Sequence, residues 1–421
     1  MADFHQPRFV TTLHALGRPG QPHALPLVTA RTQAQGLTTT LVLPALAEEF
    51  DGAALPRILQ RLSAAAPVSR MVVVLGHATA GQQAEAARQL ATVRIPTMLV
   101  RLDDALLPQV HRRLRRTGLE IVPEGKGYAC WVGICAALAA GSDAIALHDC
   151  DIESYDAGMV ARLLAPIVVP EAPFDFAKGY YPRAHARLYG RVTRLLVAPL
   201  LRALEALSLP TTLPAFMAEF RYPLAGEVAF SRSLVSELPV HAGWGLEVGT
   251  LAEIYRRQSR FRVCQVDVAE GYEHRHRCIE PSDHAGDLTT MVEQILASLV
   301  DSLARERVCL DARTLRYVLS HYRHEARRLL VAYEADAVVN GLPYDRDAEQ
   351  RTVDGFAAVV ENAIANGCRA ALPALPSWQA VVQAAPDVAV AFGDLAVASE
   401  LPAAVATVVD WGALSRLESA G

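Results

Sequence analysis

The sequence predicts an α/β fold with a mixed central sheet, followed by a helical C-terminal region. Short apolar runs alternate with helical patterns from residue 38 to about 152, and the pattern becomes mixed up to about residue 280. Beyond residue 285 the spacing of apolar residues is helical. Alternating strand and helix signals are typical of a parallel sheet covered by helices. The 421 residues exceed one typical domain of roughly 100 to 200 residues, so we expect a large domain with an appendage.

The first half of the chain contains the strand signals that position a site. The apolar runs are Thr38–Leu46, Met71–Leu75, Ile95–Val100 and Asp143–Leu147. Ligands in open sheets of this kind bind beyond the carboxyl ends of the strands. We therefore expect a site in the segments that begin at Pro44, Gly76, Arg101 and His148.

The second half begins with a strand-like segment, Asp175–Tyr181, and a long helical segment, Arg191–Leu207. Apolar residues from Leu288 to Leu303 then follow helical spacing over about four turns. This apolar stripe must be covered, and the appendage is long enough to contact a partner as well as its own domain. We therefore expect a symmetric homodimer.

Composition and charge exclude several classes of protein. A net charge of -5 lacks the basic excess of a nucleic-acid binder, and the Arg-rich stretch His111–Arg116 is interpreted as a solvated helix face. No apolar stretch reaches the 18 or so residues needed to span a bilayer. Met1–Pro7 lacks the basic start and apolar core of a signal peptide. We expect a cytoplasmic protein that binds neither nucleic acid nor membrane.

Two aspartates at the end of the fourth strand signal are the most informative feature. Asp149 and Asp151 are separated by one residue, and alternate side chains of an extended segment point the same way. Carboxylate oxygens at a strand end suit Mg²⁺ or Mn²⁺, which keep positions open for substrate phosphates. The sequence therefore predicts a divalent metal site near residue 150.

An aspartate pair in this place resembles the metal-binding motif of GT-A glycosyltransferases. Five further segments narrow the resemblance to the glucosyl-3-phosphoglycerate synthases, family 81 of the retaining enzymes. They are Val42–Glu49 (VLPALAEE, with Ala47 in place of the usual Asn or Asp), Gly125–Gly127 (GKG), Gly190–Thr193 (GRVT), Leu224–Glu227 (LAGE) and Gly243–Glu247 (GWGLE). The six segments stand in family order over roughly residues 38 to 280.

This resemblance implies a metal-dependent retaining transfer of a glucosyl group from a nucleotide-sugar, UDP-glucose first, to 3-phosphoglycerate. It implies a GT-A catalytic domain over 38–284, with a nucleotide-sugar half (38–152) and an acceptor half (153–284). Residues 1–37 would form an N-terminal extension and residues 285–421 a helical C-terminal appendage.

The donor residues follow from the first two segments. Lys126 lies between glycines at a predicted helix start, where a compact cation and free N–H groups favour an anionic diphosphate. The resemblance places Pro44, Ala45, Leu46 and Glu48 on the nucleoside. Asp149 would face either the metal or the ribose.

The segment Glu270–Arg277 offers a third metal ligand, because it contains His274 and His276. In the family a histidine here completes the metal site. His274 is the better match, and His276 remains the alternative ligand or an addition to the acceptor site.

The acceptor is expected to be an anion held by the GRVT segment. Gly190 lets a ligand approach the backbone, Arg191 offers a planar fork for carboxylate or phosphate, and Thr193 adds a hydroxyl. Lys178 and Arg183 are weaker additions to the same pocket. In a front-face transfer the leaving phosphate acts as base, so the remaining site residues, Glu227 and Glu247, would orient sugar hydroxyls or the acceptor.

Other functions stay open at this point. Glucose or mannose could be transferred to free glycerate or another small acceptor. Leu75–Ala80 (LGHATA) stands where the family has a DSGSTD-like loop, so a GDP-sugar donor is also possible. A sugar-1-phosphate nucleotidyltransferase would need an N-terminal Gly-rich, Arg- and Lys-containing signature that this chain lacks. A non-catalytic nucleotide-binding protein would tolerate loss of the metal residues, which are present here.

Overall fold

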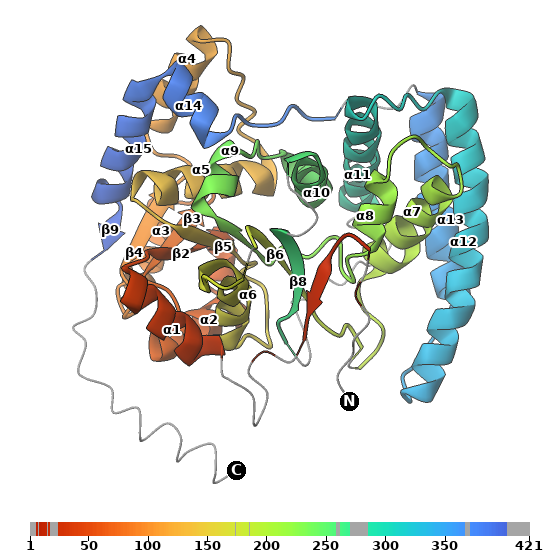
Figure 1. The fold of residues 1–421 in the computed structure, drawn as a ribbon, viewed down its shortest axis with the longest axis horizontal. Helices are drawn as coiled ribbons and strands as arrows, with labels where there is room; N and C mark the ends of the chain where they lie inside the picture. The colour runs from red at the N-terminus through yellow and green to blue at the C-terminus, as the bar shows by residue number, and fades with distance from the viewer. Residues whose placement is uncertain are drawn as a thin grey trace.

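The chain is described by a computed structural model over residues 6, 8–14, 16, 24–172, 174–184, 186–257, 262–269, 285–366 and 371–401. Strands of these residues form one sheet in the order β1-β8-β6-β7-β5-β2-β3-β4-β9 (Figure 1). Their bounds are Thr11–Leu13 (β1), Thr39–Ala45 (β2), Arg70–Leu75 (β3), Thr97–Arg101 (β4), Ala144–Leu147 (β5), Phe176–Tyr180 (β6), Val228–Ser231 (β7), Val263–Asp267 (β8) and Glu400–Leu401 (β9).

The sheet is mixed, as predicted. The central strands β5, β2, β3 and β4 are parallel neighbours, whereas β7 runs antiparallel to both β5 and β6. The register places Val42 of β2 opposite Leu147 of β5, so Pro44 and Asp149 follow this pair by two residues each. The ends of the first and fourth predicted strands therefore emerge at the same edge of the sheet.

Helices cover both faces of the sheet, and the buried apolar residues form two clusters. One face is covered by α1 (Ala24–Gln35), α2 (Ala54–Ala65), α3 (Ala80–Leu90) and α6 (Gly158–Val168). The other is covered by α4 (Leu107–Arg116), α5 (Gly125–Ala139), α9 (Arg232–Glu237) and α10 (Leu246–Arg257). Alternate residues of β2 belong to the two clusters: Leu41 and Leu43 pack on one face of the sheet and Val42 on the other.

The C-terminal region is helical, which confirms the expected appendage. Its helices are α11 (Ala285–Arg305), α12 (Ala312–Val339), α13 (Arg346–Ala365), α14 (Trp378–Ala384) and α15 (Pro386–Ala398). The predicted helix at residues 288–303 lies within α11. In Figure 1, α11, α12 and α13 stand beside α7 (Ala198–Glu205) and α8 (Leu213–Ala218), while α14 and α15 return to the far side of the molecule. There α15 packs against α5 and α4.

Both ends of the described chain add a strand to the sheet. Residues 11–13 form β1, parallel to β8, and residues 400–401 form β9, antiparallel to β4. The division at residues 37 and 284 stays a prediction, but the sheet itself extends across both boundaries. Among the described helices, none combines the length and the apolar character needed to cross a membrane.

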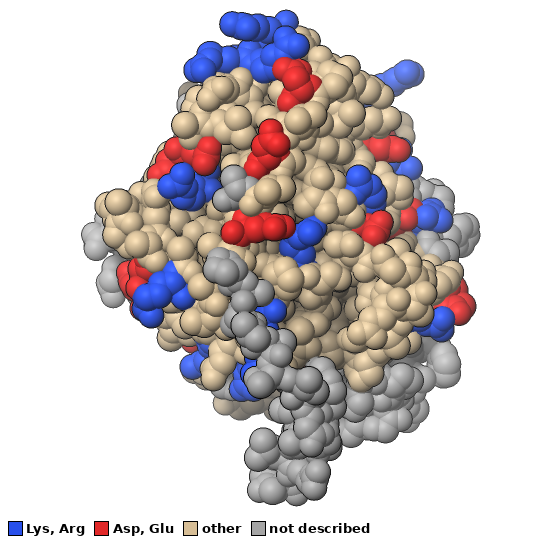
Figure 2. Space-filling model, turned by 90° about the vertical axis from the view of Figure 1, so that its left-hand side faces the viewer, with Lys and Arg blue, Asp and Glu red and all other residues tan. Residues whose placement is uncertain are grey.

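Positive side chains gather at one end of the molecule, where α4 lies (Figure 2). The exposed residues of this helix include Arg112, Arg113, Arg115 and Arg116. Arg113 pairs with Asp387 of α15 at 2.8 Å. The Arg-rich stretch is therefore a solvated helix face, as the sequence indicated, and its charges lie in the last turn, where cations stabilise a helix.

The contact between α5 and the sheet requires a glycine, which gives a stability prediction. A Cβ on Gly133 would lie 2.4 Å from Val42 Cγ1 and 2.9 Å from Val74 Cγ2. We expect Gly133→Ala to lower the free energy of unfolding by about 1–3 kcal/mol through overpacking, measured by urea denaturation. Gly355 of α13 is the control, because a Cβ there meets nothing within 4 Å. Gly355→Ala should raise stability by up to about 1 kcal/mol; equal stability of the two variants would contradict the packing argument.

Candidate active site

The centre of the candidate site is the ammonium group of Lys126. Its Nζ lies 2.6 Å from Asp149 Oδ1 and 3.2 Å from Glu247 Oε1. Burial disfavours the charged form of Lys126, but the two carboxylates outweigh this effect and hold its pKa well above the ordinary value. Lys126, at the start of α5, therefore contacts both Asp149, after β5, and Glu247, at the start of α10. The sequence predicted all three as site residues.

Close backbone approach brings Glu247 to this place. A Cβ on Gly127 would lie 2.1 Å from the carbonyl oxygen of His241, and a Cβ on Gly125 would lie 3.1 Å from Gly243 Cα. Gly125 and Gly243 also have positive φ angles, +73° and +61°. The glycines on either side of Lys126 thus let the turn η3 (Gly243–Gly245) pack directly on the start of α5.

The LAGE segment faces the same cation. A Cβ on Gly226 would stand 2.7 and 2.8 Å from the carboxylate oxygens of Asp149 and 2.8 Å from Lys126 Nζ, so a side chain there would displace this ion pair. The next side chain, Glu227, is fully buried and accepts a hydrogen bond of 2.9 Å from the Tyr181 hydroxyl. A glycine follows Lys178 for a similar reason, since a Cβ on Gly179 would lie 3.1 Å from Glu227 Cβ.

Lys178 lies beneath this segment rather than on an open surface. It is 2% exposed, and its Nζ donates to the carbonyl oxygen of Ala225 at 2.6 Å. Burial lowers the pKa of Lys178 to about 8, against the effect of Glu247 and Glu227. The sequence grouped Lys178 with the acceptor residues; its described contact supports the backbone before Gly226.

Asp151 belongs to a concentration of carboxylates. Burial raises its pKa to about 7, and the neighbouring charge of Asp149 adds to the rise. The charges of Glu227 and Glu49 also raise the pKa of Asp151, whereas the charge of Lys126 lowers it. A divalent cation would stabilise such a cluster, and carboxylate oxygens are suitable ligands for Mg²⁺ or Mn²⁺. The residues present therefore fit a metal of this kind.

The described residues do not complete a metal site by themselves. Within the ranges given above, no group of three or more His, Cys, Asp or Glu is placed to hold a metal ion. His274 and His276, the two candidates for the third protein ligand, lie outside the described residues. Their assignment stays a prediction.

The predicted nucleoside segment lies at the end of β2. Pro44 and Ala45 are its last residues, and Leu46 is 49% exposed just before the turn η1 (Ala47–Glu49). Glu48 is exposed, whereas the charge of Glu49 helps to raise the pKa of Asp151. Sequence reasoning missed Glu49, although it stands in the same segment.

The segment that replaces the family's loop after the second strand begins a helix. Thr79 accepts a hydrogen bond from the backbone N–H of Gln82, and the Gln82 side chain accepts one from the backbone N–H of Thr79, so together they form a capping box for α3. A Cβ on Gly76 would lie 3.2 Å from Leu46 Cδ2. The residues after β3 thus lie beside the end of β2, as the predicted topology requires.

The predicted acceptor segment lies next to a group of aromatic and basic residues. Gly190 has a φ of +73°, and a Cβ there would lie 3.8 Å from the Tyr222 ring and 3.9 Å from Arg183 Nε. The Arg183 guanidinium lies 5.3 Å from the centroid of Tyr222 and 5.9 Å from that of Tyr181. Because Tyr181 bonds Glu227, this group connects Gly190 with the buried carboxylate.

Arg191 and Thr193 follow Gly190 at the start of a helix. Arg191 is exposed and Thr193 is 8% exposed, at the first residue of the π-helical turn η2 (Thr193–Val197). Burial raises the pKa of Tyr222, and Arg183 and Thr193 act against this rise. The sequence had no signal for Tyr181 and Tyr222, because nothing in a single chain shows that these tyrosines meet the LAGE and GRVT segments.

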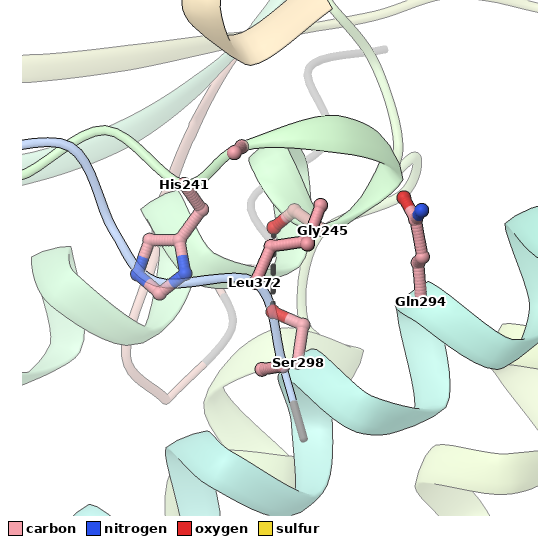
Figure 3. Close-up of a pocket in the computed structure, with 7 residues that line it drawn as sticks. His241, Gly245, Gln294, Ser298 and Leu372 are labelled. Atoms are coloured by element: carbon pink, nitrogen blue, oxygen red, sulfur yellow. Dashed lines mark hydrogen bonds between the residues drawn. The ribbon is translucent and has the colours of Figure 1, made fainter. Parts of the chain in front are cut away.

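Trp244, the aromatic residue of the GWGLE segment, is 44% exposed, and its backbone N–H donates to Gln294 Oε1 of α11 at 2.8 Å. A small pocket lies beside this turn (Figure 3). In Figure 3, Gln294 and Ser298 project from α11 toward the turn, and Ser298 donates to the Gly245 carbonyl oxygen at 3.3 Å. The C-terminal helices therefore support the segment that carries Glu247.

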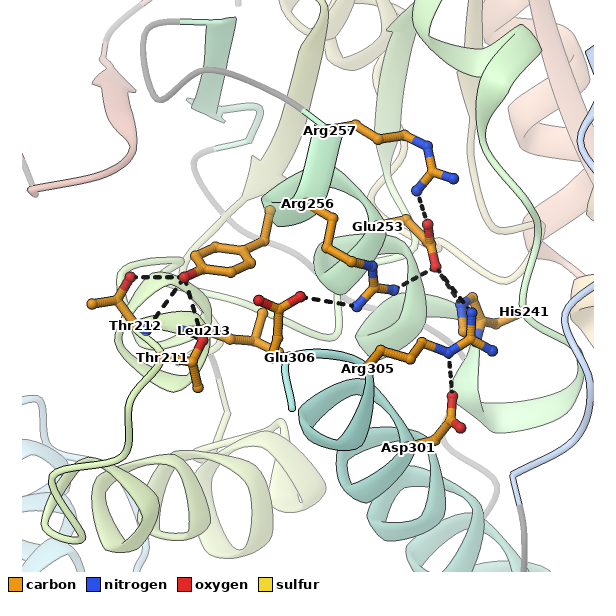
Figure 4. A network of polar contacts seen from close by, with 11 residues as sticks. Thr211, Thr212, Leu213, His241, Glu253, Arg256, Arg257, Asp301, Arg305 and Glu306 are labelled. Atoms are coloured by element: carbon orange, nitrogen blue, oxygen red, sulfur yellow. Dashed lines mark hydrogen bonds and ion pairs between the residues drawn. The ribbon is translucent and has the colours of Figure 1, made fainter. Parts of the chain in front are cut away.

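A buried ionic network anchors α10 from its other end (Figure 4). Glu253 is 1% exposed, forms ion pairs with Arg256 and Arg257 of its own helix, and lies 3.8 Å from Arg305 of α11. His241 approaches the same carboxylate at 3.7 Å. Burial lowers the pKa of His241 to about 4, and Arg305 and Arg256 lower it further, so this imidazole is neutral near pH 7.

No protein-family model matches the chain. Curated relatives do. The glucosyl-3-phosphoglycerate synthase of Persephonella marina is 34% identical over 394 residues, which are 92% of this chain and 96% of that protein. The protein of the same name from Methanococcoides burtonii is 32% identical over 359 residues, 83% of this chain and 87% of that one.

Solved structures give the same result for the fold. The glucosyl-3-phosphoglycerate synthase of Mycobacterium tuberculosis in complex with Mg²⁺ and UDP is 25% identical, with a TM-score of 0.52 over 70% of this chain and 87% of that one. Its complex with Mn²⁺, UDP-glucose and phosphoglyceric acid gives a TM-score of 0.52 and 25% identity over 69% and 87%. The GT-A fold that the sequence predicted is confirmed. This chain belongs to the glucosyl-3-phosphoglycerate synthase family of GT-A glycosyltransferases.

Proposed function

We propose that this enzyme transfers the glucosyl group of UDP-glucose to 3-phosphoglycerate with retention of configuration, in a metal-dependent reaction. The observation that carries the proposal is the meeting of Asp149, Lys126 and Glu247 at the edge of the sheet. Structures of the Mycobacterium tuberculosis relative contain UDP-glucose, phosphoglyceric acid and Mn²⁺, and these ligands define the substrates to test first.

The donor would bind across the ends of β2 and β5. Lys126 is the donor-binding cation: its charge is secured by two carboxylates, and it lies at the N-terminus of α5, where backbone N–H groups attract an anion. The diphosphate would lie there, with Pro44, Ala45, Leu46 and Glu48 along the nucleoside. Asp149 would turn toward the ribose or the metal when the diphosphate binds Lys126.

Asp151 would hold the metal together with Asp149 and His274. A divalent cation supplies charge neutralisation for the departing diphosphate when it is bound. The half-buried Asp151 carboxyl, near other acidic groups, is suited to this because it gains more from a cation than a fully solvated carboxylate does.

Two glutamates would orient the reacting sugar and acceptor. Glu227 is held by Tyr181, and Glu247 is held by Lys126, so both carboxylates have fixed directions. Positioning of this kind needs no carboxylate pair of the hydrolase type, because a leaving phosphate can accept the acceptor proton.

The acceptor would bind at the GRVT segment. Gly190 leaves the backbone open, Arg191 is exposed at the helix start, and Thr193 lies behind it. His276 is a further candidate for the anionic group, Arg183 lies within reach of Gly190, and the buried Lys178 would act through the backbone that it supports. A three-carbon acid with a phosphate matches this set of positive groups.

A screen of donors against acceptors tests the proposal. UDP-glucose, GDP-glucose and GDP-mannose are combined with 3-phosphoglycerate and with free glycerate, and the products are identified by mass spectrometry and NMR. We expect glucosyl-3-phosphoglycerate with an α linkage as the main product. A main product from glycerate or from a GDP-sugar would replace the proposed substrates, and no transfer from any pair would favour a non-catalytic nucleotide-binding role.

Metal dependence is the second expected outcome. Excess chelator should abolish transfer, and Mg²⁺ or Mn²⁺ should restore it. Asp151→Ala should lower kcat by about a hundredfold or more, as when one strong electrostatic stabiliser is lost. Full activity in chelator, or a near-normal rate for the variant, would remove the metal or this residue from the mechanism.

Acceptor binding by Arg191 gives the third expected outcome. Arg191→Ala should raise the KM for 3-phosphoglycerate roughly tenfold to a thousandfold and leave the KM for the donor nearly unchanged. Arg202→Ala on α7 is the control, since Arg202 is 51% exposed and makes only a 3.8 Å surface pair with Glu325. Loss of donor affinity with unchanged acceptor affinity would contradict the assignment of the two halves.

We also propose that the protein is a homodimer. The stripe from Leu288 to Leu303, on which the sequence based this expectation, packs into the chain's own core, so we place the contact at α12 instead. This helix lies at the edge of the molecule and leaves Tyr317, Val331, Val338 and Val339 between 52% and 86% exposed (Figure 1). Light scattering at micromolar concentration should give about twice the 45.5 kDa of one chain. Val338→Asp should shift the mass toward one chain, whereas a 45.5 kDa particle for the unaltered protein would exclude the dimer.

A further inference from the structure

Arg194, the residue that follows the GRVT segment, connects this segment to the C-terminal helices. Its Nη1 and Nη2 donate to the two carboxylate oxygens of Glu349 at 2.7 Å each. The two side chains are only 13% and 17% exposed. This is a bidentate, largely desolvated charge pair, which is the geometry in which an arginine holds a carboxylate most firmly.

The same guanidinium also holds the loop that leads to Gly190. Nε donates to the carbonyl oxygen of Tyr189 at 2.8 Å, and Nη2 donates to that of Leu188 at 3.3 Å. The Tyr189 N–H donates to the Arg183 carbonyl oxygen at 2.8 Å, and the Arg194 N–H donates to that of Gly190 at 2.9 Å. The described residues of the 183–194 loop (183, 184 and 186–194) are therefore held by the Arg194 side chain together with two backbone hydrogen bonds.

Glu349 is the outer support of this arrangement. It lies in the first turn of α13, about 155 residues away in sequence, where a carboxylate is also favoured by the helix dipole. Tyr333 of α12 adds a second contact, because its ring centroid lies 4.9 Å from the Arg194 guanidinium and its hydroxyl donates to the Arg194 carbonyl oxygen at 3.3 Å. Two C-terminal helices thus fix the direction of one arginine.

The loop that Arg194 closes contains the groups around the acceptor position. Arg183, at its first residue, lies over Tyr222 and beside Gly190, and Gly190 precedes Arg191. A displacement of the Leu188 and Tyr189 carbonyls would move Gly190 and Arg191 directly. In the described part of the chain, Arg194 forms no hydrogen bond or ion pair with Lys126 or Glu247.

We infer that Glu349 and Arg194 are positioning residues for the acceptor: through this pair, the C-terminal helices hold the 183–194 loop in the conformation that binds the acceptor anion. The acceptor side of the inference rests on the function proposed above. It gives the helical appendage a role in acceptor affinity, in addition to its packing on the catalytic sheet.

Steady-state kinetics with UDP-glucose and 3-phosphoglycerate test the inference. Glu349→Ala should raise the acceptor KM about ten- to hundredfold, as expected when one member of a part-buried charge pair is removed, with the donor KM changed less than about twofold. Glu349→Gln, which can still accept a hydrogen bond, should have a smaller effect in the same direction. Equal rises of both KM values would indicate a general loss of structure and overturn the inference.

Glu361→Ala is the matched control. Glu361 also lies on α13 and pairs with Arg323 of α12 at 2.8 Å, but this pair is exposed and makes no contact with the loop. Both KM values should therefore stay within about twofold of the unaltered enzyme. A rise in acceptor KM equal to that of Glu349→Ala would show that loss of any ion pair of α13 has the same effect, and would overturn the inference.

A charge swap separates positioning of the loop from simple joining of the helices. Arg194→Glu combined with Glu349→Arg restores an ion pair between the two elements, but a glutamate at 194 cannot donate to the carbonyls of Leu188 and Tyr189. Thermal stability should recover relative to Arg194→Glu alone, while the acceptor KM should stay high. Recovery of the acceptor KM in the swap would overturn the positioning role.

Hydrogen exchange in the free protein provides a readout that does not depend on activity. In Glu349→Ala, the amides of Tyr189 and Arg194 should exchange at least about tenfold faster than in the unaltered protein and in Glu361→Ala. Unchanged exchange would overturn the inference. If the unaltered protein transfers glucose to no acceptor, the proposed function fails, and faster exchange would still establish the loop contact; faster exchange with an unchanged acceptor KM would refute the link to acceptor binding.

Discussion

The pairing of Lys126 with Asp149 and Glu247 is the interaction on which the site depends. One ammonium group lies between two carboxylates, from the segment after β5 and from the start of α10, and its charge offsets part of their mutual repulsion where the strand, helix and turn meet. Gly226 closes the arrangement, since a side chain there would collide with the Asp149 carboxylate and with Lys126. If a diphosphate bound here, Lys126 would exchange its carboxylate partners for phosphate oxygens. The positive charge of Lys126 is therefore required both with and without a donor.

Glycine decides how closely the segments of the site approach one another. Gly127 faces the backbone of His241, and a Cβ on Gly249 would meet the ring of His241 at 2.1 Å. His241 is therefore enclosed by two backbone segments and reaches the buried carboxylate of Glu253. The segment from His241 to Glu247 is thus fixed at both ends, by packing on α5 and by the ionic network that joins α10 to α11.

The C-terminal helices contact the segments that carry the candidate site residues. Gln294 and Ser298 of α11 bond the GWG turn, Arg305 contributes to the network around Glu253, and Glu349 of α13 holds the loop before the GRVT segment. These contacts reach both halves of the candidate site. A region without a recognisable motif therefore holds, through its side chains, the backbone around the candidate site.

The sequence by itself determined the α/β class, the four central strands and the end of β5 as the place of the acidic pair. These features depend on local alternation of apolar residues and on short segments such as GKG and LAGE, which a single chain displays directly. The family resemblance named Lys126, Asp149, Glu227 and Glu247 as site residues; the structure brings Lys126, Asp149 and Glu247 together, and the roles of all four stay predictions.

Only the tertiary structure decided which side chains touch. The bond from Tyr181 to Glu227, the influence of Glu49 on Asp151 and the pairing of Arg194 with Glu349 join residues whose local sequences show no periodicity or motif that relates them. The strands β1 and β9 were also not predicted, because strands of three and two residues are too short to show an alternating pattern. They form because the edge of a sheet offers unpaired backbone hydrogen-bonding groups. Contacts of this kind follow from the packing of whole elements, which no local pattern contains.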